Sequence, residues 1–218
     1  MKCLGLIPAR AGSKGVPNKN LRSLCGRPLL EYTCEAARSS RRLTRTILST
    51  DSVRMAEAGR DAGVEAPFLR PAEFAADDTP MKLVVRHALD WLEANETYSP
   101  DIVVLLQPTS PLRTGAQIDE AVDLLIASRA DSVVSVTTVP AHYHPAWQFR
   151  VDDGELRLLS GEPIDRIITS RQMLPTTYTR NGAIYAFWRR TLTELGSFYG
   201  SRTMAYVMAH EDSVNIDS

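Results

Sequence analysis

The sequence predicts an α/β domain built on a mostly parallel β-sheet, and three observations lead to that fold class. Short apolar runs alternate with helical patterns over the first two-thirds of the chain, as in successive βαβ units. Residues 102–106 are apolar without interruption, which is typical of a strand covered on both faces. The 218 residues contain no linker-like break in composition, so we expect a single domain over residues 1–218.

The apolar runs of the first two-thirds are interpreted as buried strands, with residues 102–106 near the centre of the sheet. In chain order these strands cover residues 3–8, 45–50, 64–68, 101–107 and 131–138.

Helices are predicted between these strands. Apolar residues recur at three- and four-residue steps within residues 81–92 and 118–125, so each segment carries one apolar stripe. Thr114 with Gln117 three residues later forms a capping-box pattern before the second of these helices. Pro28 suits the first position of an earlier helix.

The pattern changes after about residue 139, where the strand-like pieces become shorter and turn signals such as that at residues 152–154 separate them. We expect mixed or antiparallel pairing there, with residues of about 139–180 forming an extension that serves as a lid or a dimer arm. The predicted strands of this part are residues 145–151, 155–159, 182–188 and 203–208.

Composition excludes several classes of protein. The 25 basic and 26 acidic residues leave a net charge of −1, so no global field attracts nucleic acid or an anionic membrane. The three cysteines have neither disulfide-framework nor zinc-ligand spacing, which suits a reducing compartment. We find no apolar stretch long enough to cross a bilayer and no signal-peptide pattern, so we expect a cytoplasmic protein.

The loop of residues 9–20, between the first strand and the helix after Pro28, carries the strongest functional signal and is called the phosphate loop after the ligand expected there. It contains Gly12 and Gly15 together with the cations Arg10, Lys14 and Lys19. Glycines let backbone N–H groups approach phosphate oxygens, and the cations balance polyphosphate charge. The order of residues matches neither a P-loop nor a dinucleotide fingerprint. A solvated surface loop is the alternative, and the strand-to-helix junction favours a phosphate site.

Other polar residues follow the predicted strands and so belong to the same edge of the sheet. In an open parallel sheet, ligands bind beyond the carboxyl ends of the strands. Arg10, residues 49–51, Arg70 and residues 107–113 all take such positions, and together they form the candidate site.

These blocks together resemble one known family, the acylneuraminate cytidylyltransferases. The likeness runs in order through nearly the whole chain, in residues 7–15 with 19–20, 49–51, 69–73, 105–114 and 181–185. The resemblance implies a three-layer Rossmann-like nucleotidyltransferase fold with a small mixed-β dimerisation or lid extension. It also implies transfer of CMP from CTP to the anomeric hydroxyl of a nonulosonic, sialic-type acid, with release of pyrophosphate, and a homodimer.

The resemblance also implies roles for individual residues. Arg10, Lys14 and Lys19 are expected to act in catalysis by neutralising the triphosphate. The nucleotide-binding residues implied are Arg10, Ser13, Lys14, Gly15, Lys19, Asn20, Arg70 and Asp77. A surface position remains the alternative for Arg70, and a place at the start of the next helix the alternative for Asp77.

On the acceptor side, the resemblance implies Gln107, Arg171, Asn181 and Tyr185, with Arg171 clamping a carboxylate. Tyr185 could equally be a core residue. Mg²⁺ is the implied cofactor, held by Asp217 and by Asn215 where the family usually has a second aspartate.

Several alternatives stay open at this point. The acceptor could be another acidic molecule, such as a different keto-acid sugar or a phosphonate. Asn215 motivates a nucleotide-binding homologue with impaired catalysis, and the glycine-bearing loop is shared with nucleotidyltransferases for sugar 1-phosphates. His142 and His144 lack a carboxylate or thiol partner nearby in the sequence, so substrate contact or an interface is favoured over zinc.

Overall fold

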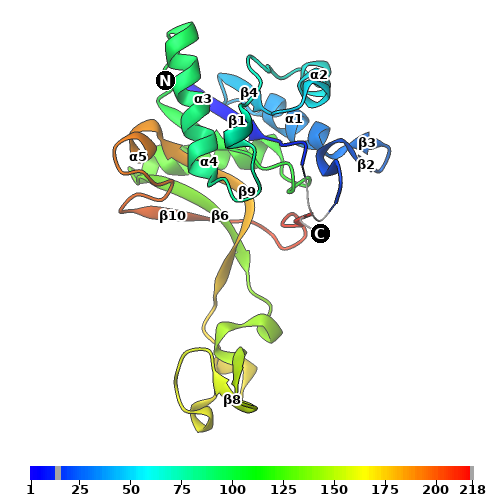
Figure 1. Cartoon of the computed structure of the whole chain (residues 1–218). Coiled ribbons are helices and arrows are strands. Elements are labelled where there is room, and N and C mark those ends of the chain that lie inside the picture. Colours follow the sequence, from blue (N-terminus) through cyan, green and yellow to red (C-terminus); the bar gives the residue numbers. More distant parts are fainter. Residues whose placement is uncertain (13–15, 217–218) are drawn as a thin grey trace.

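The computed structural model describes residues 1–12 and 16–216, and these residues form an α/β fold around a six-stranded sheet (Figure 1). The strand order is β10-β6-β9-β5-β1-β4. Within the described chain, β9 runs antiparallel to both of its neighbours, while every other pairing in this sheet is parallel. The predicted fold class is confirmed, and β5 lies in the interior of the sheet as expected. In chain order the strands of this sheet are β1 Cys3–Pro8, β4 Arg45–Ser49, β5 Ile102–Leu105, β6 Ser132–Thr138, β9 Tyr178–Trp188 and β10 Thr203–Val207.

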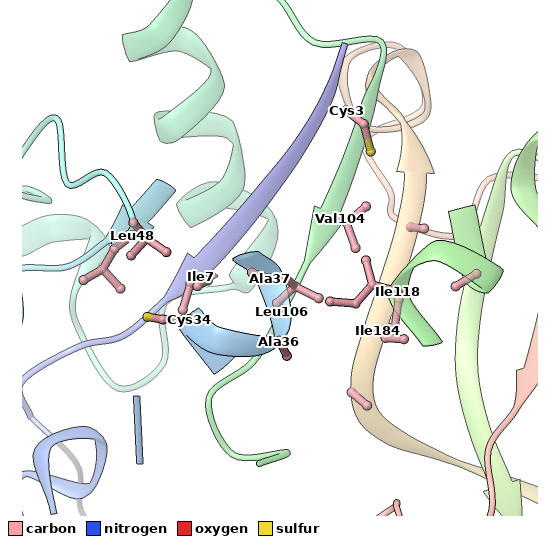
Figure 2. Close-up of a cluster of buried hydrophobic side chains, with 14 of the residues drawn as sticks. Cys3, Ile7, Cys34, Ala36, Ala37, Leu48, Val104, Leu106, Ile118 and Ile184 are labelled. Carbon is pink, nitrogen blue, oxygen red and sulfur yellow. The ribbon is translucent and has the colours of Figure 1, made fainter. Parts of the chain in front are cut away.

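Helices cover both faces of the sheet and make three layers. The buried side chains of α1, α2 and α4 pack in one cluster with Cys3 and Ile7 of β1 (Figure 2). Those of α3 and α5 pack in a second cluster with Leu4 and Leu6 of the same strand. In the part of the chain that the structure describes, the helices are α1 Leu29–Ser39, α2 Val53–Asp61, α3 Met81–Glu96, α4 Gly115–Ser128 and α5 Arg189–Thr193.

The alternation along β1 explains why this strand is apolar throughout. Successive side chains of a strand point to opposite faces, and here each face meets a helical layer. Leu4, Leu6 and Ile7 are fully buried. Each such side chain contributes about 1.5–3 kcal/mol by leaving water, so the strand is held firmly where its carboxyl end meets the phosphate loop.

The helix boundaries follow the predicted signals closely. Thr114 caps α4, and its hydroxyl accepts from the Gln117 N–H while the Gln117 side chain accepts from the Thr114 N–H, so the predicted capping box is confirmed. Pro28 differs by one position. It is the cap residue in an extended conformation, and α1 begins at Leu29, because Pro28 pairs with Ser23 in the small β2–β3 ladder (β2 Ser23–Leu24, β3 Arg27–Pro28).

The strand predicted at residues 64–68 is wrong. That segment makes only isolated bridges, including Glu65 with Ile47, along the outer edge of β4. Pro67 has no N–H to donate, which prevents a regular ladder. The side chains still alternate, with Val64, Ala66 and Phe68 buried, and Arg70 continues this inward series.

Between β6 and β9 the chain leaves the sheet and forms a projecting extension over residues 139–177 (Figure 1). It carries the antiparallel hairpin β7 Phe149–Asp152 and β8 Glu155–Leu158. The strand predicted at residues 145–151 was placed too early, because Pro145–Trp147 forms a 3-10 turn capped by His144. The strand predicted at 182–188 is longer and starts at Tyr178.

The 3-10 turns of the described chain are η1 Lys19–Leu21, η2 Ala72–Phe74, η3 Ala141–Tyr143, η4 Pro145–Trp147, η5 Ile164–Arg166 and η6 Arg171–Met173.

A helix that crosses a bilayer needs about 20 predominantly apolar residues. Within the described ranges, none combines the length and the apolar character needed to cross a membrane.

Candidate functional site

A pocket of about 520 Å³ opens at the carboxyl edge of the sheet, where the sequence placed the candidate site. It gathers residues from the loop after β1, the loop after β5, the start of β9 and the C-terminal segment. Its lining residues are Pro8, Arg10, Lys19, Asn20, Arg70, Met81, Gln107, Pro108, Thr109, Arg180, Gly182, Tyr185 and Asn215.

The chain around the phosphate loop is held by hydrogen bonds from the neighbouring strand end. The Ala9 N–H donates to the Ser49 carbonyl at 3.0 Å, and the Ala11 N–H donates to Asp51 Oδ1 at 2.8 Å. On the far side of the loop, the buried Asn20 side chain donates to the Arg10 carbonyl at 3.3 Å. These bonds fix the two ends of the loop and place the Arg10 and Lys19 side chains in the pocket wall.

Arg10 forms an ion pair with Asp77, which lies in the segment before α3. Both side chains are about one-third exposed, so the pair stands at the rim of the pocket in contact with water. Asp77 does not start the next helix, which begins at Met81. In the described chain it contacts the phosphate-loop arginine instead.

Arg70 is buried at 5% exposure and is not a surface charge. Its Nε donates to Ser49 Oγ at 3.1 Å, and its terminal nitrogens donate to the carbonyls of Ser49 and Phe74. Burial away from water lowers the pKa of the Arg70 guanidinium to about 10. The group stays protonated at neutral pH and presents a weakly hydrated positive charge to the pocket.

Gln107, Gly182 and Asn215 come together on the opposite wall. Gly182 has φ +78°, and a Cβ at this position would lie 3.0 Å from Gln107 Oε1 and 3.7 Å from Asn215 Nδ2. The C-terminal segment reaches this wall because the Ile216 N–H donates to the Thr109 carbonyl at 2.8 Å. Both amide side chains therefore offer donors and acceptors to a ligand in the same place.

Arg113 supports this wall from below. Its guanidinium is buried and donates to the carbonyls of Gln107 and Ala183, at 3.2 and 2.7 Å, and to Thr33 Oγ1 at 2.7 Å. Burial away from water lowers the pKa of the Arg113 guanidinium. Arg113 belongs to the strand-end residues of the candidate site, but it holds the pocket wall and does not line the pocket.

Tyr185 and Asn181 take different positions on β9. Tyr185 packs in the second core cluster and also lines the pocket, so both predicted roles are compatible with its place. Asn181 is buried, and its side chain accepts from Ser135 Oγ at 2.6 Å and donates to Ser213 Oγ at 2.9 Å. It ties β9 to β6 and to the C-terminal segment, and it is not among the residues that line the pocket.

Arg180 lines the pocket, and sequence reasoning missed it. The expectation that ligands bind beyond the carboxyl ends of strands applies to parallel strands. Because β9 runs in the opposite direction, its amino-terminal residues reach the same edge. The charged residue directly before Asn181 was the available signal.

The extension holds the remaining predicted residues. Arg171 is exposed on η6 and is absent from the pocket of its own chain. His144 is buried, with Nε2 at 2.9 Å from the Pro175 carbonyl and Nδ1 accepting from the Ala146 N–H, so it stabilises the extension. The His142 ring packs against the Tyr143 ring in a tilted arrangement, with 4.1 Å between the ring centroids.

The predicted metal ligands are only partly described. Asn215 lines the pocket, whereas Asp217 lies outside the described residues, as do Ser13, Lys14 and Gly15 of the phosphate loop. Within residues 1–12 and 16–216, no group of three or more His, Cys, Asp or Glu side chains is placed to hold a metal ion. The Asn215 amide oxygen suits Mg²⁺ as one neutral ligand, and an ion there would need carboxylate or phosphate oxygens in addition.

The charges of the pocket favour an anionic ligand. Arg10, Lys19, Arg70 and Arg180 line it, and none of the described lining residues is acidic. Neighbouring cations in a cleft concentrate phosphate or carboxylate groups. The size, the charge and the two amide side chains fit a polyphosphate together with a second polar, anionic molecule.

Comparison with known families gives one match over almost the whole chain. A family model described as cytidylyltransferase matches residues 4–210.

Among curated proteins, the chain is similar to N-acylneuraminate cytidylyltransferase of Escherichia coli, with 35% identity over 99% of this chain and 49% of the relative. It is 34% identical to the CMP-N,N'-diacetyllegionaminic acid synthase of Legionella pneumophila, over 100% of this chain and 92% of that protein. The chain thus spans about half the length of the N-acylneuraminate cytidylyltransferases that it matches and nearly all of the Legionella protein.

Solved structures share the fold at lower identity. CMP:2-keto-3-deoxy-manno-octonic acid synthetase complexed with CTP has a TM-score of 0.72 at 17% identity, covering 100% of this chain and 94% of the other. A 4-diphosphocytidyl-2C-methyl-D-erythritol synthase from Anaerococcus prevotii has a TM-score of 0.61 at 13% identity, covering 100% and 93%.

Proposed function

Because the chain belongs to the cytidylyltransferase family, we propose that it transfers CMP from CTP to the anomeric hydroxyl of a nonulosonic, sialic-type acid. The observation that carries the proposal is that one pocket has the phosphate-loop cations on one wall and Gln107 with Asn215 on the opposite wall. Relatives named for N-acylneuraminate and for legionaminic acid support an acidic nine-carbon sugar as acceptor.

In the proposed reaction, the anomeric hydroxyl oxygen attacks the α-phosphorus of CTP and loses its proton. The bond from the α-phosphorus to the bridging oxygen breaks, and that electron pair leaves with pyrophosphate. Arg10, Lys19 and Arg70 all line the pocket, and in this proposal their positive charges neutralise the charge that grows on the leaving group. Such reactions depend mainly on positioning and charge stabilisation, which these fixed side chains provide.

We also propose Mg²⁺ as cofactor, with Asn215 and Asp217 as the residues that would hold it. When bound, the ion would neutralise phosphate oxygens and help to orient the triphosphate. The neutral Asn215 amide supplies no charge, so the surrounding arginines take a larger share of the charge neutralisation.

A homodimer formed through the extension is part of the proposal. Large apolar side chains stand exposed there, including Val151 at 66% and Met173 at 71%. Clustered exposed apolar residues mark protein interfaces. Arg171 lies on the same extension, away from the pocket of its own chain, so a contact with substrate would be made in the neighbouring subunit.

A reducing compartment, the cytoplasm, fits the cysteines. Cys3, Cys25 and Cys34 are all free, and burial raises the pKa of Cys3 and of Cys34 to about 12. The thiols of Cys3 and Cys34 therefore stay protonated at neutral pH, which fits a compartment where cysteines remain reduced.

The test is a substrate panel that follows pyrophosphate release. ATP, GTP, UTP and CTP are each combined with sialic, legionaminic and pseudaminic acids, 2-keto-3-deoxy-octonate, a phosphonate and a sugar 1-phosphate, with and without Mg²⁺. We expect release with CTP and a nonulosonic acid, dependent on Mg²⁺.

Each contrary result points to a specific rival. Release only with a phosphonate or a sugar 1-phosphate would reject the acceptor, and CTP binding without turnover under every condition would identify a nucleotide-binding homologue that lacks catalysis. Undiminished release after chelation of divalent ions would reject the cofactor.

A further inference from the structure

We propose that Arg180 recognises the carboxylate of the acceptor, with Tyr199 holding its guanidinium in place. The inference rests on the proposed function and assigns selection of an acidic acceptor to Arg180, which lines the pocket, in place of Arg171, which does not line the pocket of its own chain. Arg180 lines the pocket from the amino-terminal part of β9.

The position of Arg180 separates it from the phosphate loop. In the sheet, β5 lies between β9 and β1, so two strand spacings of about 5 Å each stand between the two walls. The pairing of β5 with β9 ends at Leu105 and Tyr185, and Arg180 extends past that point to pair with Val136 of β6. It therefore faces the end of the pocket that lies away from the triphosphate cations.

The charge of Arg180 remains available to a ligand. Its guanidinium donates to the Tyr199 hydroxyl at 3.4 Å and interacts with Tyr185, both of which are neutral partners. The other two arginines of the pocket differ, because Arg10 pairs with Asp77 and Arg70 donates to backbone carbonyls. Among the described pocket arginines, Arg180 is the one whose charge has neither a carboxylate partner nor a set of carbonyl acceptors.

Tyr199 is fixed well enough to orient this arginine. Its carbonyl accepts hydrogen bonds from Ser132 Oγ at 2.7 Å and from Thr203 Oγ1 at 2.6 Å, which anchor its backbone between β6 and β10. A planar guanidinium held at one edge still has a free edge for a carboxylate, which it binds with two parallel N–H···O bonds.

The neighbouring groups complete an acceptor site. Gln107 and Asn215 lie on the same side of the pocket and can bind hydroxyl or acetamido groups of the sugar. In a nonulosonic acid the carboxylate is bonded to the anomeric carbon, so a carboxylate at Arg180 would hold the attacking hydroxyl beside it, on the side of the α-phosphorus, and would leave the rest of the sugar against these amides.

The experiment compares an acid with its own amide. The nonulosonic acid that gives the highest turnover in the substrate panel, and the C1 amide of that acid, are assayed with wild type, Arg180→Ala, Arg180→Lys and Tyr199→Phe. In Arg180→Ala we expect kcat/KM for the acid to fall by about 10- to 100-fold, the loss typical of one charge-assisted hydrogen-bond pair. The KM for CTP should change less than about twofold, and the preference for acid over amide should nearly vanish.

The conservative variants sharpen the test. Arg180→Lys keeps the positive charge but lacks the two parallel N–H donors of a guanidinium, so it should retain part of the preference for acid over amide. Tyr199→Phe should weaken that preference by a few-fold. Arg54→Ala, an exposed arginine on α2, serves as the matched control with unchanged kinetics. A general folding defect would lower activity toward acid and amide alike, so the ratio is insensitive to it.

Failure of the inference on Arg180 can be distinguished from failure of the proposed function. If wild type is active but Arg180→Ala keeps the acid preference of wild type, the inference is wrong and the proposed function stands. If wild type turns over no sugar acid at all, the proposed function fails and the role of Arg180 falls with it.

Discussion

The backbone conformation and the neighbouring side chains of a pocket residue determine which amino acids fit at its position. Gly182 shows this well, because its backbone has φ +78° and a Cβ there would press on Gln107 Oε1 at 3.0 Å. Its place in the wall thus depends on two separate properties of glycine, the left-handed backbone and the missing side chain.

We predict that Gly182→Ala weakens acceptor binding by displacing Gln107. The positive φ alone should cost about 1–2 kcal/mol of stability. In addition, the KM for the acceptor should rise several-fold while the KM for CTP stays close to that of wild type. Steady-state kinetics with each substrate varied in turn, together with urea unfolding, provide both numbers.

Gly154 provides the matched control. It has φ +85° in the β7–β8 turn, and a Cβ there would meet nothing within 4 Å. Gly154→Ala should lose a similar amount of stability with no kinetic change. Equal kinetic effects in the two variants would show that Gln107 is not displaced.

At this scale the sequence predicted part of the site. Arg10, Lys19, Asn20, Arg70, Gln107, Tyr185 and Asn215 were named and do line one pocket. The roles of Arg113 and Asn181 in supporting the wall were not predicted, because a sequence does not show whether a polar side chain turns toward the ligand or toward other polar groups of the protein.

At the level of elements, the contact between α4 and the turn after α1 shows how one side chain can order a connection. Asp119 of α4 accepts from Ser40 Oγ at 2.5 Å and from the N–H groups of Arg41 and Arg42. Gly115 lets the two helices approach, since a Cβ there would lie 2.4 Å from Ser39 Oγ. This turn leads directly into β4, whose carboxyl end supports the phosphate loop.

Asp119 should make stability depend on pH. Partial burial raises the pKa of Asp119, but the hydrogen bonds from Ser40, Arg41 and Arg42 outweigh burial and lower it overall. The stabilisation is complete above the pKa of about 4 that the carboxyl has in the unfolded chain, and it is lost as pH falls through the lower folded value.

We predict that Asp119→Asn loses about 1 kcal/mol at pH 7, a modest amount because the carboxylate is partly exposed. The difference from wild type should shrink below about pH 4, as measured by urea unfolding across pH. Asp123→Asn, one turn further along α4, removes an exposed pair with Arg42 and should have little effect. A difference that persists at low pH would mean that the charge of Asp119 is irrelevant.

Element prediction succeeded where local signals agreed with tertiary packing. The apolar runs gave β1, β4, β5 and β6, and the capping box marked the start of α4. It failed at residues 64–68, where Pro67 denies the segment a ladder although its side chains alternate correctly. Sequence pattern reports which face is buried more directly than it reports hydrogen-bond partners.

For the whole molecule, the fold class followed from the order of apolar runs, whereas the shape of the extension did not. The mixed pairing after residue 139 was expected, but the projection seen in Figure 1 depends on how β6 and β9 continue together beyond the sheet. Their pairing reaches Thr138 and Tyr178, at the base of the extension.

We predict that the homodimer dissociates when one face of the β7–β8 hairpin is charged. Val151 and Leu156 are direct cross-strand partners, and both are exposed, at 66% and 49%. Val151→Asp combined with Leu156→Asp should turn a dimer into a monomer in analytical ultracentrifugation at micromolar concentration, since charges are poorly tolerated in the core of an interface.

Arg150→Gln changes the opposite face of the same hairpin and should leave the dimer intact. A wild-type chain that sediments as a monomer throughout the micromolar range would refute the homodimer itself, and a double variant that remains dimeric would place the interface elsewhere.

β9 has one further consequence. The same eleven residues, Tyr178–Trp188, begin at the root of the projection, pass the mouth of the pocket and end in the core. A change in β9 that adapts the pocket to a new sugar therefore also displaces the residues from which the extension departs. If the proposed homodimer forms through the extension, acceptor selectivity and subunit assembly should change together during evolution.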